Sequence, residues 1–142
     1  MYTYNSFKTL DDFVNTMWGL NMTDTVFKTL GNYPPYDILK ETSGNTTYYI
    51  LNMALAGFKK EDIEVLFIQD QLIIRPTSDR IKKDKQEMKR YVNRGISNKE
   101  FQRTFAVDKS LSVESVTFVD GILSIRMKVN SMSDDVKRFE IK

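Results

Sequence analysis

The dipeptide Asp120-Gly121 separates two β-prone segments, residues 113–119 and 122–129, and restricts the fold of this chain more than any other feature. Asp-Gly is a preferred centre for a two-residue turn with positive φ at both positions, so the flanking segments should pair as an antiparallel hairpin. Further β-prone segments, bounded by turn residues, lie at residues 48–53, 63–68, 72–75 and 101–107. Short strands recurring with turns between them predict an all-β fold, an immunoglobulin-like β-sandwich.

Composition divides the chain into three parts. Residues 1–36 are rich in aromatic side chains and predict an N-terminal arm that is short and helical or partly disordered. Thr9 and Thr23 are suitable N-caps for two short helices there, and we expect no helix beyond residue 31. Residues 37–129 are the predicted sandwich. Residues 130–142 begin with a polar run that cannot bury itself and form the predicted C-terminal tail.

Charge and residue usage exclude several classes of function. Lys and Arg number 21 and Asp and Glu number 19, a net charge of +2, which argues against a dedicated nucleic-acid or membrane binder. The absence of His and Cys excludes disulfides, Ser–His–Asp triads and Cys- or His-ligated zinc. No targeting segment and no membrane-length apolar run is visible, so a soluble cytoplasmic protein is expected.

No catalytic, cofactor-binding or metal-binding residues are predicted. The paired carboxylates Asp11-Asp12, Glu61-Asp62 and Asp134-Asp135 fit a helix start, a strand start and the polar tail. Adjacent residues of a strand point to opposite faces, so such pairs do not converge on one substrate atom. An enzyme using Lys, Tyr or carboxylate chemistry stays open as an alternative, with no set of residues to assign to it.

Residues 78–90 contain six basic side chains, diluted by Asp79, Asp84 and Glu87. Without interleaved aromatic residues this pattern does not match a nucleic-acid-binding module and predicts a long solvated loop. Loops of this length within a small sandwich usually have a function. The short β-prone segment Tyr91-Val92 lies in this one.

Two features indicate assembly. Arg103 lies between Phe101 and Phe105 on the predicted apolar face of a strand, where an unpaired charge is costly. We expect an ion pair within the protein or across a subunit boundary, with Glu87 as the candidate partner; an Arg snorkelling to water is the alternative. Phe139 and Ile141, two residues apart, share one face of an extended tail segment that could dock into a groove or form the last strand of the chain's own sheet.

Several segments match one protein family in order and spacing: Tyr33-Pro34-Pro35-Tyr36-Asp37, Ala54-Leu55-Ala56-Gly57-Phe58, Asn93-Arg94-Gly95-Ile96, Phe101-Gln102-Arg103-Thr104-Phe105, Asp120-Gly121-Ile122-Leu123 and Phe139-Glu140-Ile141. On these segments the chain resembles the small heat shock proteins, the α-crystallin-domain chaperones, and most of all their bacterial inclusion-body-binding branch. It departs from the family pattern at Val116, where the family has Ala, at Asp120, where it usually has Asn, and at Phe139, where it has Ile.

The resemblance implies an ATP-independent holdase of the stress response, which binds unfolding client proteins through apolar surfaces and prevents their irreversible aggregation. Its implied partners are those clients, further copies of itself as dimers assembling into large homo-oligomers, and ATP-dependent chaperones downstream. No specific nucleic acid, membrane or cofactor is implied. The alternative is a monomeric or dimeric co-chaperone or assembly adaptor on the same sandwich.

The resemblance also implies roles for particular residues. Client contacts are expected in the arm, at Phe7, Phe13, Val14, Trp18 and Phe27. Dimer contacts are expected at Tyr91, Val92 and Arg103, with Tyr91-Val92 adding a strand to the partner's sheet. The tail anchor, Phe139 and Ile141, is expected in a groove lined by Ile63, Val65, Phe67, Val113, Ser115 and Thr117. In this prediction Val116 and Phe118 point away from the groove, into the sandwich.

Overall fold

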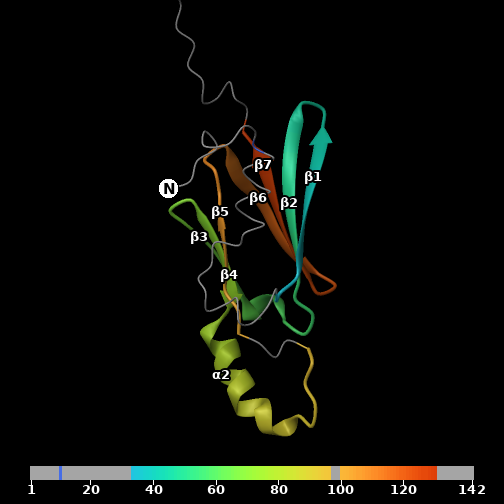
Figure 1. Ribbon diagram of the computed structural model, residues 1–142, viewed down its shortest axis with the longest axis vertical. Coiled ribbons are helices and arrows are strands. Elements are labelled where there is room, and N and C mark those ends of the chain that lie inside the picture. Colours follow the sequence, from blue (N-terminus) through green and yellow to red (C-terminus); the bar gives the residue numbers. More distant parts are fainter. Residues whose placement is uncertain (1–9, 11–32, 97–99, 131–142) are drawn as a thin grey trace, which may run out of the picture.

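The computed structural model describes residues 10, 33–96 and 100–130, so the arm, apart from its last residues and Leu10, and the tail beyond Asn130 lie outside the described part. Two antiparallel sheets face each other (Figure 1). One has the strand order β1-β2-β7-β6 and the other β3-β4-β5. Their bounds are β1 Tyr36–Ser43, β2 Thr46–Ala54, β3 Ile63–Ile68, β4 Gln71–Pro76, β5 Arg103–Ala106, β6 Leu111–Val119 and β7 Ile122–Val129. The predicted all-β sandwich is confirmed.

The β6–β7 hairpin turns at Asp120 and Gly121, as predicted, with φ of 53° and 79°. A Cβ on Gly121 would lie 3.4 Å from the Cα of Ala56, so the turn also packs against the chain that follows β2. The β3–β4 turn uses Gln69 and Asp70, whose φ values of 47° and 63° are uncommon for residues other than glycine.

The core lies between the sheets and is made by alternate residues of the inner strands. Leu51 and Met53 of β2 pair in register with Ile125 and Leu123 of β7, and all four side chains are buried. The opposite sheet contributes Phe105, whose ring meets Tyr36 edge to face at 5.3 Å between centroids. Paired residues of an antiparallel ladder point to the same face, so the register shows which face of each strand is internal.

Two parts of the chain differ from the sequence prediction. Strand β1 was not predicted; it is an edge strand with mostly exposed residues, and therefore lacks a clear apolar pattern. The predicted loop contains helix α2, Ser78–Glu87, followed by the 3-10 turn η4, Met88–Arg90, and a further 3-10 turn, η3, Lys60–Asp62, precedes β3. The expectation of no helix beyond residue 31 was therefore wrong. Thr77 caps α2 by accepting a hydrogen bond from the Arg80 amide at 3.2 Å.

Helix α2 escaped prediction because its buried side is charged rather than apolar: Arg80 is its buried residue. The predicted strand Tyr91-Val92 lies outside the strands of this single chain. Among the described residues, no helix is long and apolar enough to cross a membrane.

Candidate functional site

An apolar groove runs between β3 and β6, the edge strands of the two sheets. It consists of two adjoining hollows of about 330 Å³ each, and both are lined by Val65 and Val116. The first hollow is completed by Phe67, Leu72, Leu111, Ser112 and Val113. The second is completed by Lys60, Ile63, Thr117, Phe118 and Leu123.

The groove exists because the sheets leave the inner faces of both edge strands partly uncovered. Val65 pairs with the buried Ile74, and Val116 pairs with the buried Ile125, so both valines point inward. Val116 nevertheless stays 44% exposed and Phe67 50% exposed. Apolar side chains left open in this way form a surface suited to an apolar ligand.

The structure corrects the predicted lining of the groove. Val116 and Phe118 do face the interior, but that same face forms the groove, so the prediction that they point away from it was wrong. The register shifts between Val113 and Ser115, and this irregularity places Val113 on the same face as Val116. Ser115 pairs with Arg126 and is exposed outside the groove.

The other predicted groove residues, Ile63, Val65, Phe67, Val113 and Thr117, are brought together by the fold. Sequence reasoning missed Lys60, Leu72, Leu111, Ser112 and Leu123 as well as Val116 and Phe118. On β6 the bulge interrupts the strand alternation. Lys60, Leu72 and Leu123 belong to other elements, which only the tertiary fold brings to the groove. The predicted anchor, Phe139 and Ile141, and the arm residues Phe7, Phe13, Val14, Trp18 and Phe27 lie outside the described residues.

Arg103 is 4% exposed and points inward opposite Ile74. Its Nη2 donates to the Pro34 carbonyl at 3.4 Å, and its guanidinium lies 5.7 Å from the centre of the Tyr36 ring. The Arg103 Nε is buried without a hydrogen-bond partner among the described residues. Glu87, the candidate partner, instead lies 3.7 Å from Arg90. Burial lowers the pKa of Arg103 against a smaller opposite effect of Tyr36.

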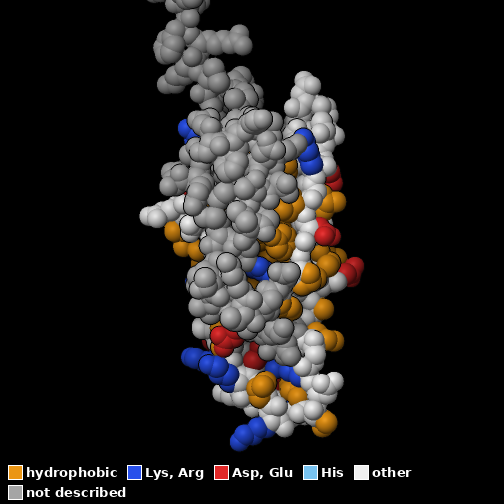
Figure 2. Space-filling view, in the orientation of Figure 1, with side chains coloured by type: hydrophobic (Ala, Val, Ile, Leu, Met, Phe, Trp, Pro, Cys, Tyr) orange, Lys and Arg blue, Asp and Glu red, His pale blue; other side chains and the backbone are white. Residues whose placement is uncertain are grey.

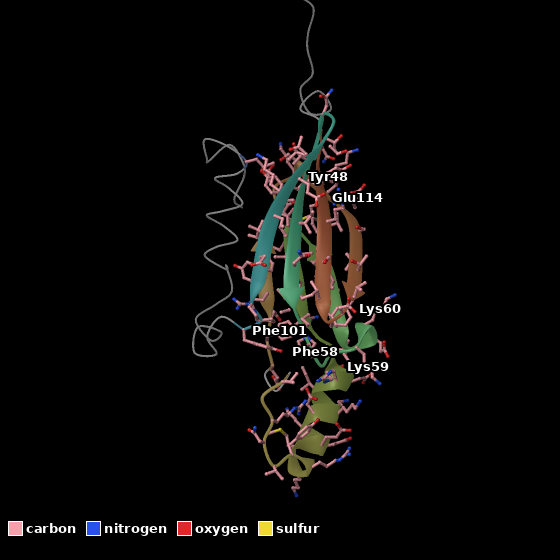
Figure 3. All side chains as sticks on the ribbon, turned by 90° about the vertical axis from the view of Figure 1, so that its right-hand side faces the viewer. Tyr48, Phe58, Lys59, Lys60, Phe101 and Glu114 are labelled. Atoms are coloured by element: carbon pink, nitrogen blue, oxygen red, sulfur yellow. The ribbon has the colours of Figure 1, made fainter. Side chains whose placement is uncertain are left out.

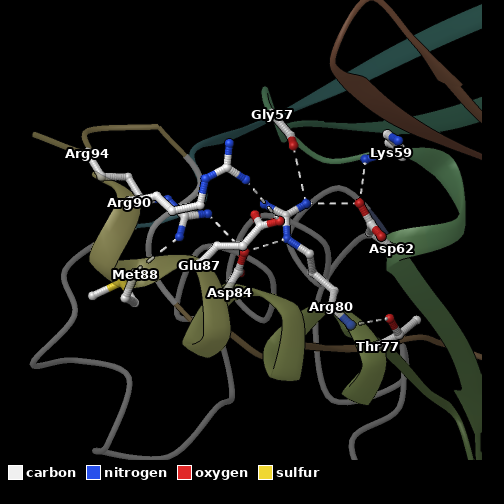
Figure 4. Close-up of polar contacts among 10 residues, drawn as sticks. All are labelled: Gly57, Lys59, Asp62, Thr77, Arg80, Asp84, Glu87, Met88, Arg90 and Arg94. Carbon is white, nitrogen blue, oxygen red and sulfur yellow. Dashed lines mark hydrogen bonds and ion pairs between the residues drawn. The ribbon is translucent and has the colours of Figure 1, made fainter. Parts of the chain in front are cut away.

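Arg80 holds a second polar cluster, which sequence reasoning missed (Figure 4). Its Nη1 donates to Asp62 Oδ2 at 2.9 Å and to the Gly57 carbonyl at 3.2 Å, and its Nε donates to Asp84 Oδ1 at 2.9 Å. The guanidinium lies 4.2 Å from the centre of the Phe58 ring. The four-residue spacing of Arg80 and Asp84 was the available signal, since such pairs meet on one helix face.

Asp84 connects this cluster to the segment after α2. The same Oδ1 accepts from Arg94 Nη2 at 2.9 Å, and Arg94 lies 4.5 Å from the centre of the Tyr91 ring. Burial raises the pKa of Asp84, but the hydrogen bonds from Arg94 and Arg80 outweigh it, so this carboxyl has a pKa below its usual range. Nearby, four large apolar side chains are exposed: Met88, Tyr91, Val92 and Ile96.

The open edge of β1 provides a further surface. Acidic and apolar side chains are interspersed on the side of the molecule where β1 runs, with Lys or Arg at its upper end, and further Lys and Arg side chains lie at the end of the molecule formed by α2 (Figure 2). Asp37, Leu39 and Glu41 occupy alternate positions of β1 and are exposed. Glu41 accepts from Arg126 at 3.0 Å; Arg126 lies over the Tyr48 ring and bonds Glu114, both labelled in Figure 3.

Within residues 10, 33–96 and 100–130, no group of three or more acidic side chains lies together in a way that could hold a metal ion. Three features of the described part of the chain are suited to binding: the apolar groove, the buried Arg103 without a carboxylate partner there and the exposed apolar segment after α2.

The family model of the Hsp20/alpha crystallin family matches residues 41–142. The chain belongs to this family. Its members are chaperones rather than enzymes. Similar curated proteins include the small heat shock protein IbpB of Escherichia coli O7:K1, 33% identical over 94 residues, which are 66% of this chain and 61% of that protein. The chain thus spans about three fifths of the length of the curated relatives it matches. The resemblance to the inclusion-body-binding branch is confirmed.

Solved structures of small heat shock proteins share the fold. The small heat shock protein from Synechococcus phage S-ShM2 has a TM-score of 0.53 at 29% identity, covering 72% of this chain and 99% of that chain. Heat shock protein 16.0 from Schizosaccharomyces pombe has a TM-score of 0.58 at 22% identity, covering 96% of this chain and 100% of that chain. At the latter identity the likeness concerns the fold alone.

Proposed function

We propose that this protein is an ATP-independent holdase that binds unfolding proteins in the cytoplasm and prevents their irreversible aggregation. The open apolar groove carries the proposal, together with membership of a chaperone family. Val65, Phe67 and Val116 keep apolar surface exposed in the folded chain, and such surface can bind apolar segments of other chains. Reversible assembly would cover part of it until clients appear.

Light scattering tests this activity. A heat-aggregating client should scatter less in the presence of the protein without ATP, and the bound client should regain activity when an ATP-dependent chaperone is added. Suppression that required ATP would contradict a holdase. Equal scattering with and without the protein would favour the alternative, a co-chaperone or assembly adaptor that binds one folded partner.

The tail of another subunit is the proposed occupant of the groove. Side chains two residues apart on one strand face are separated by about 7 Å. The two hollows adjoin at Val65 and Val116, so Phe139 and Ile141 can occupy one hollow each. Burial of two such side chains contributes roughly 3–5 kcal/mol before entropy, so each link is weak and many links are needed for a particle.

Dimers are proposed to form through residues 88–96, here called the assembly segment. Its Tyr91-Val92 part would pair with the open edge of β1 in a second copy. Val92 is fully exposed, Tyr91 already has extended backbone angles, and the preceding Lys89 and Arg90 complement Asp37 on β1. Backbone hydrogen bonds supply most of the affinity in strand addition.

Clients are proposed to bind the aromatic arm, through Phe7, Phe13, Val14, Trp18 and Phe27. Aromatic and apolar side chains in an adaptable segment can fit many different apolar surfaces.

Arg103 is proposed to complete its pairing with a carboxylate of a second subunit, because its buried Nε has no partner within the described residues. Size-exclusion chromatography with light scattering distinguishes the proposed chaperone from the adaptor alternative. A protein that stays monomeric would favour the adaptor.

A further inference from the structure

We propose that Arg80 is the positioning residue of the assembly segment: it docks helix α2 on the sandwich and thereby sets where residues 88–96 are presented to a second copy. The inference rests on the proposed pairing of Tyr91-Val92 with a neighbouring β1. It concerns a residue outside both sheets, whose role is to hold a segment and not to touch the partner.

Helix α2 has little apolar attachment to the rest of the protein. It projects from one end of the sandwich, beyond the sheets (Figure 1). Within the described part of the chain, the core cluster includes no residue of α2, and the one buried residue of the helix is Arg80. Most surface helices are held by an amphipathic apolar face, and α2 lacks one.

Arg80 supplies the missing attachment through the connection between β2 and β3. Its Nη1 bonds the Gly57 carbonyl at 3.2 Å and Asp62 at 2.9 Å, and its guanidinium covers the Phe58 ring at 4.2 Å. Phe58 is itself buried and meets Phe101 edge to face at 5.8 Å, at the end of the sandwich next to α2 (Figure 3). One side chain therefore joins the helix to the core.

The attachment continues into the assembly segment through one oxygen atom. Asp84 Oδ1 accepts from Arg80 Nε and from Arg94 Nη2, each at 2.9 Å. Arg94 in turn lies over the Tyr91 ring at 4.5 Å. Charge-assisted hydrogen bonds of this kind are strong and directional. The position of Tyr91 is thus linked, contact by contact, to the buried Phe58.

The linkage predicts a role beyond stability. If Arg80 is removed, α2 and the assembly segment lose their fixed placement while the apolar core between the sheets stays intact. A second copy would then bind a segment that must first be ordered, and that ordering lowers the apparent affinity.

The test compares full-length Arg80→Met with Arg75→Met. Arg75 bonds Glu64 at 2.8 Å within the β3–β4 ladder, so the control removes an equally short ion pair that does not touch α2. Hydrogen exchange of residues 78–96 and the dimer dissociation constant are measured for both. Arg80→Met should accelerate exchange in α2 and weaken the dimer, each by about tenfold or more, with exchange in β2 and β7 unchanged.

Arg80→Lys is the conservative variant. A single ammonium can pair with Asp62 but cannot reproduce the fork that also holds Asp84, so it should restore only part of the dimer affinity. Should Arg80→Met fail to fold, Asp84→Asn tests the same linkage, since it keeps the Arg80–Asp62 pair and weakens the connection to Arg94.

If Val92→Pro abolishes the dimer, so that the proposed interface stands, two results would overturn the inference: unchanged exchange in α2 of Arg80→Met, or faster exchange with an unchanged dissociation constant. A parent chain that stays monomeric at every concentration would overturn the proposed dimer and this inference together. These outcomes differ in the behaviour of the parent chain, so the two failures are distinguishable.

Discussion

Val65 and Val116 come from edge strands of different sheets and together line both hollows of the apolar groove. Val116 stays 44% exposed although its cross-strand partner Ile125 is fully buried. The groove is thus the uncovered margin of the core. A ligand docked there would extend the core packing of the sandwich.

Substitution at Val116 should separate assembly from folding. Val116→Asp places a carboxylate in both hollows, so docking of an apolar tail should fail and large particles should shrink to dimers. Phe139→Ala with Ile141→Ala should give the same result from the other side of the contact. Val119→Asp, at another exposed position of β6, is the matched control and should assemble normally. The particle mass of each variant is measured by light scattering. If Val116→Asp and the Phe139→Ala/Ile141→Ala double variant both form particles of the parental size, the tail is not the link between subunits.

Pairing of the assembly segment with β1 depends on the backbone. Val92→Pro removes the Val92 amide donor and should give folded monomers with an unchanged thermal midpoint. Val92→Thr keeps a β-branched residue and the amide, so dimers should persist. Sedimentation at a range of concentrations measures both. Dimers that survive the proline would place the interface elsewhere.

Arg103 should matter more for assembly than for the single chain. Arg103→Met roughly keeps the volume of the side chain and removes a buried charge whose Nε has no partner in the described part of the chain, so the isolated sandwich should keep or raise its unfolding midpoint. Assembly should weaken, because the second subunit would keep a buried carboxylate without its partner, a loss of about 3–5 kcal/mol. Chemical unfolding and dimer dissociation are measured on the same samples. Weaker folding with unchanged assembly would contradict an intersubunit pair.

Docking of α2 on the sandwich should be lost at low pH, when Asp84 becomes protonated. The pKa of this carboxyl is held below its ordinary value of 3.8, so its contribution is complete above that pH and is lost as pH falls through the folded-state pKa. Amide chemical shifts of α2 should stay constant from about pH 8 to 5 and move toward coil values only below the ordinary carboxyl range. Those of β7 report on the sandwich. A helix released above pH 5 would contradict this assignment.

Truncation should separate client binding from the fold. A chain starting at Asn32 keeps every described strand and should remain folded, form smaller particles and lose most suppression of client aggregation. Trp18→Ala with Phe13→Ala in the full chain should lower suppression without changing the unfolding midpoint. Full suppression by the truncated chain would move the client site to the groove.

Local sequence determined most of the strands and their turns, but not the edge strand β1. The turn forms at Asp120 and Gly121 because both residues adopt positive φ, and few other residue types do so at low conformational energy. Segments such as residues 63–68 and 122–129 have high β-propensity, which is a local property of their side chains. The same local signals predicted a sandwich and an apolar strand face with Phe101 and Phe105, both of which are buried.

Tertiary structure decided the groove and the placement of α2. Strand order and the bulge after Val113 decide whether Val116 is covered by the core or lies at its uncovered edge. Neither can be inferred from the alternation of residues along one strand. Helix α2 is held by Arg80 contacts to Gly57 and Asp62, about twenty positions earlier in the chain. From local sequence alone, charged residues are expected to be exposed to solvent. Only the complete fold brings near the partners that lower the free-energy cost of burying a charge.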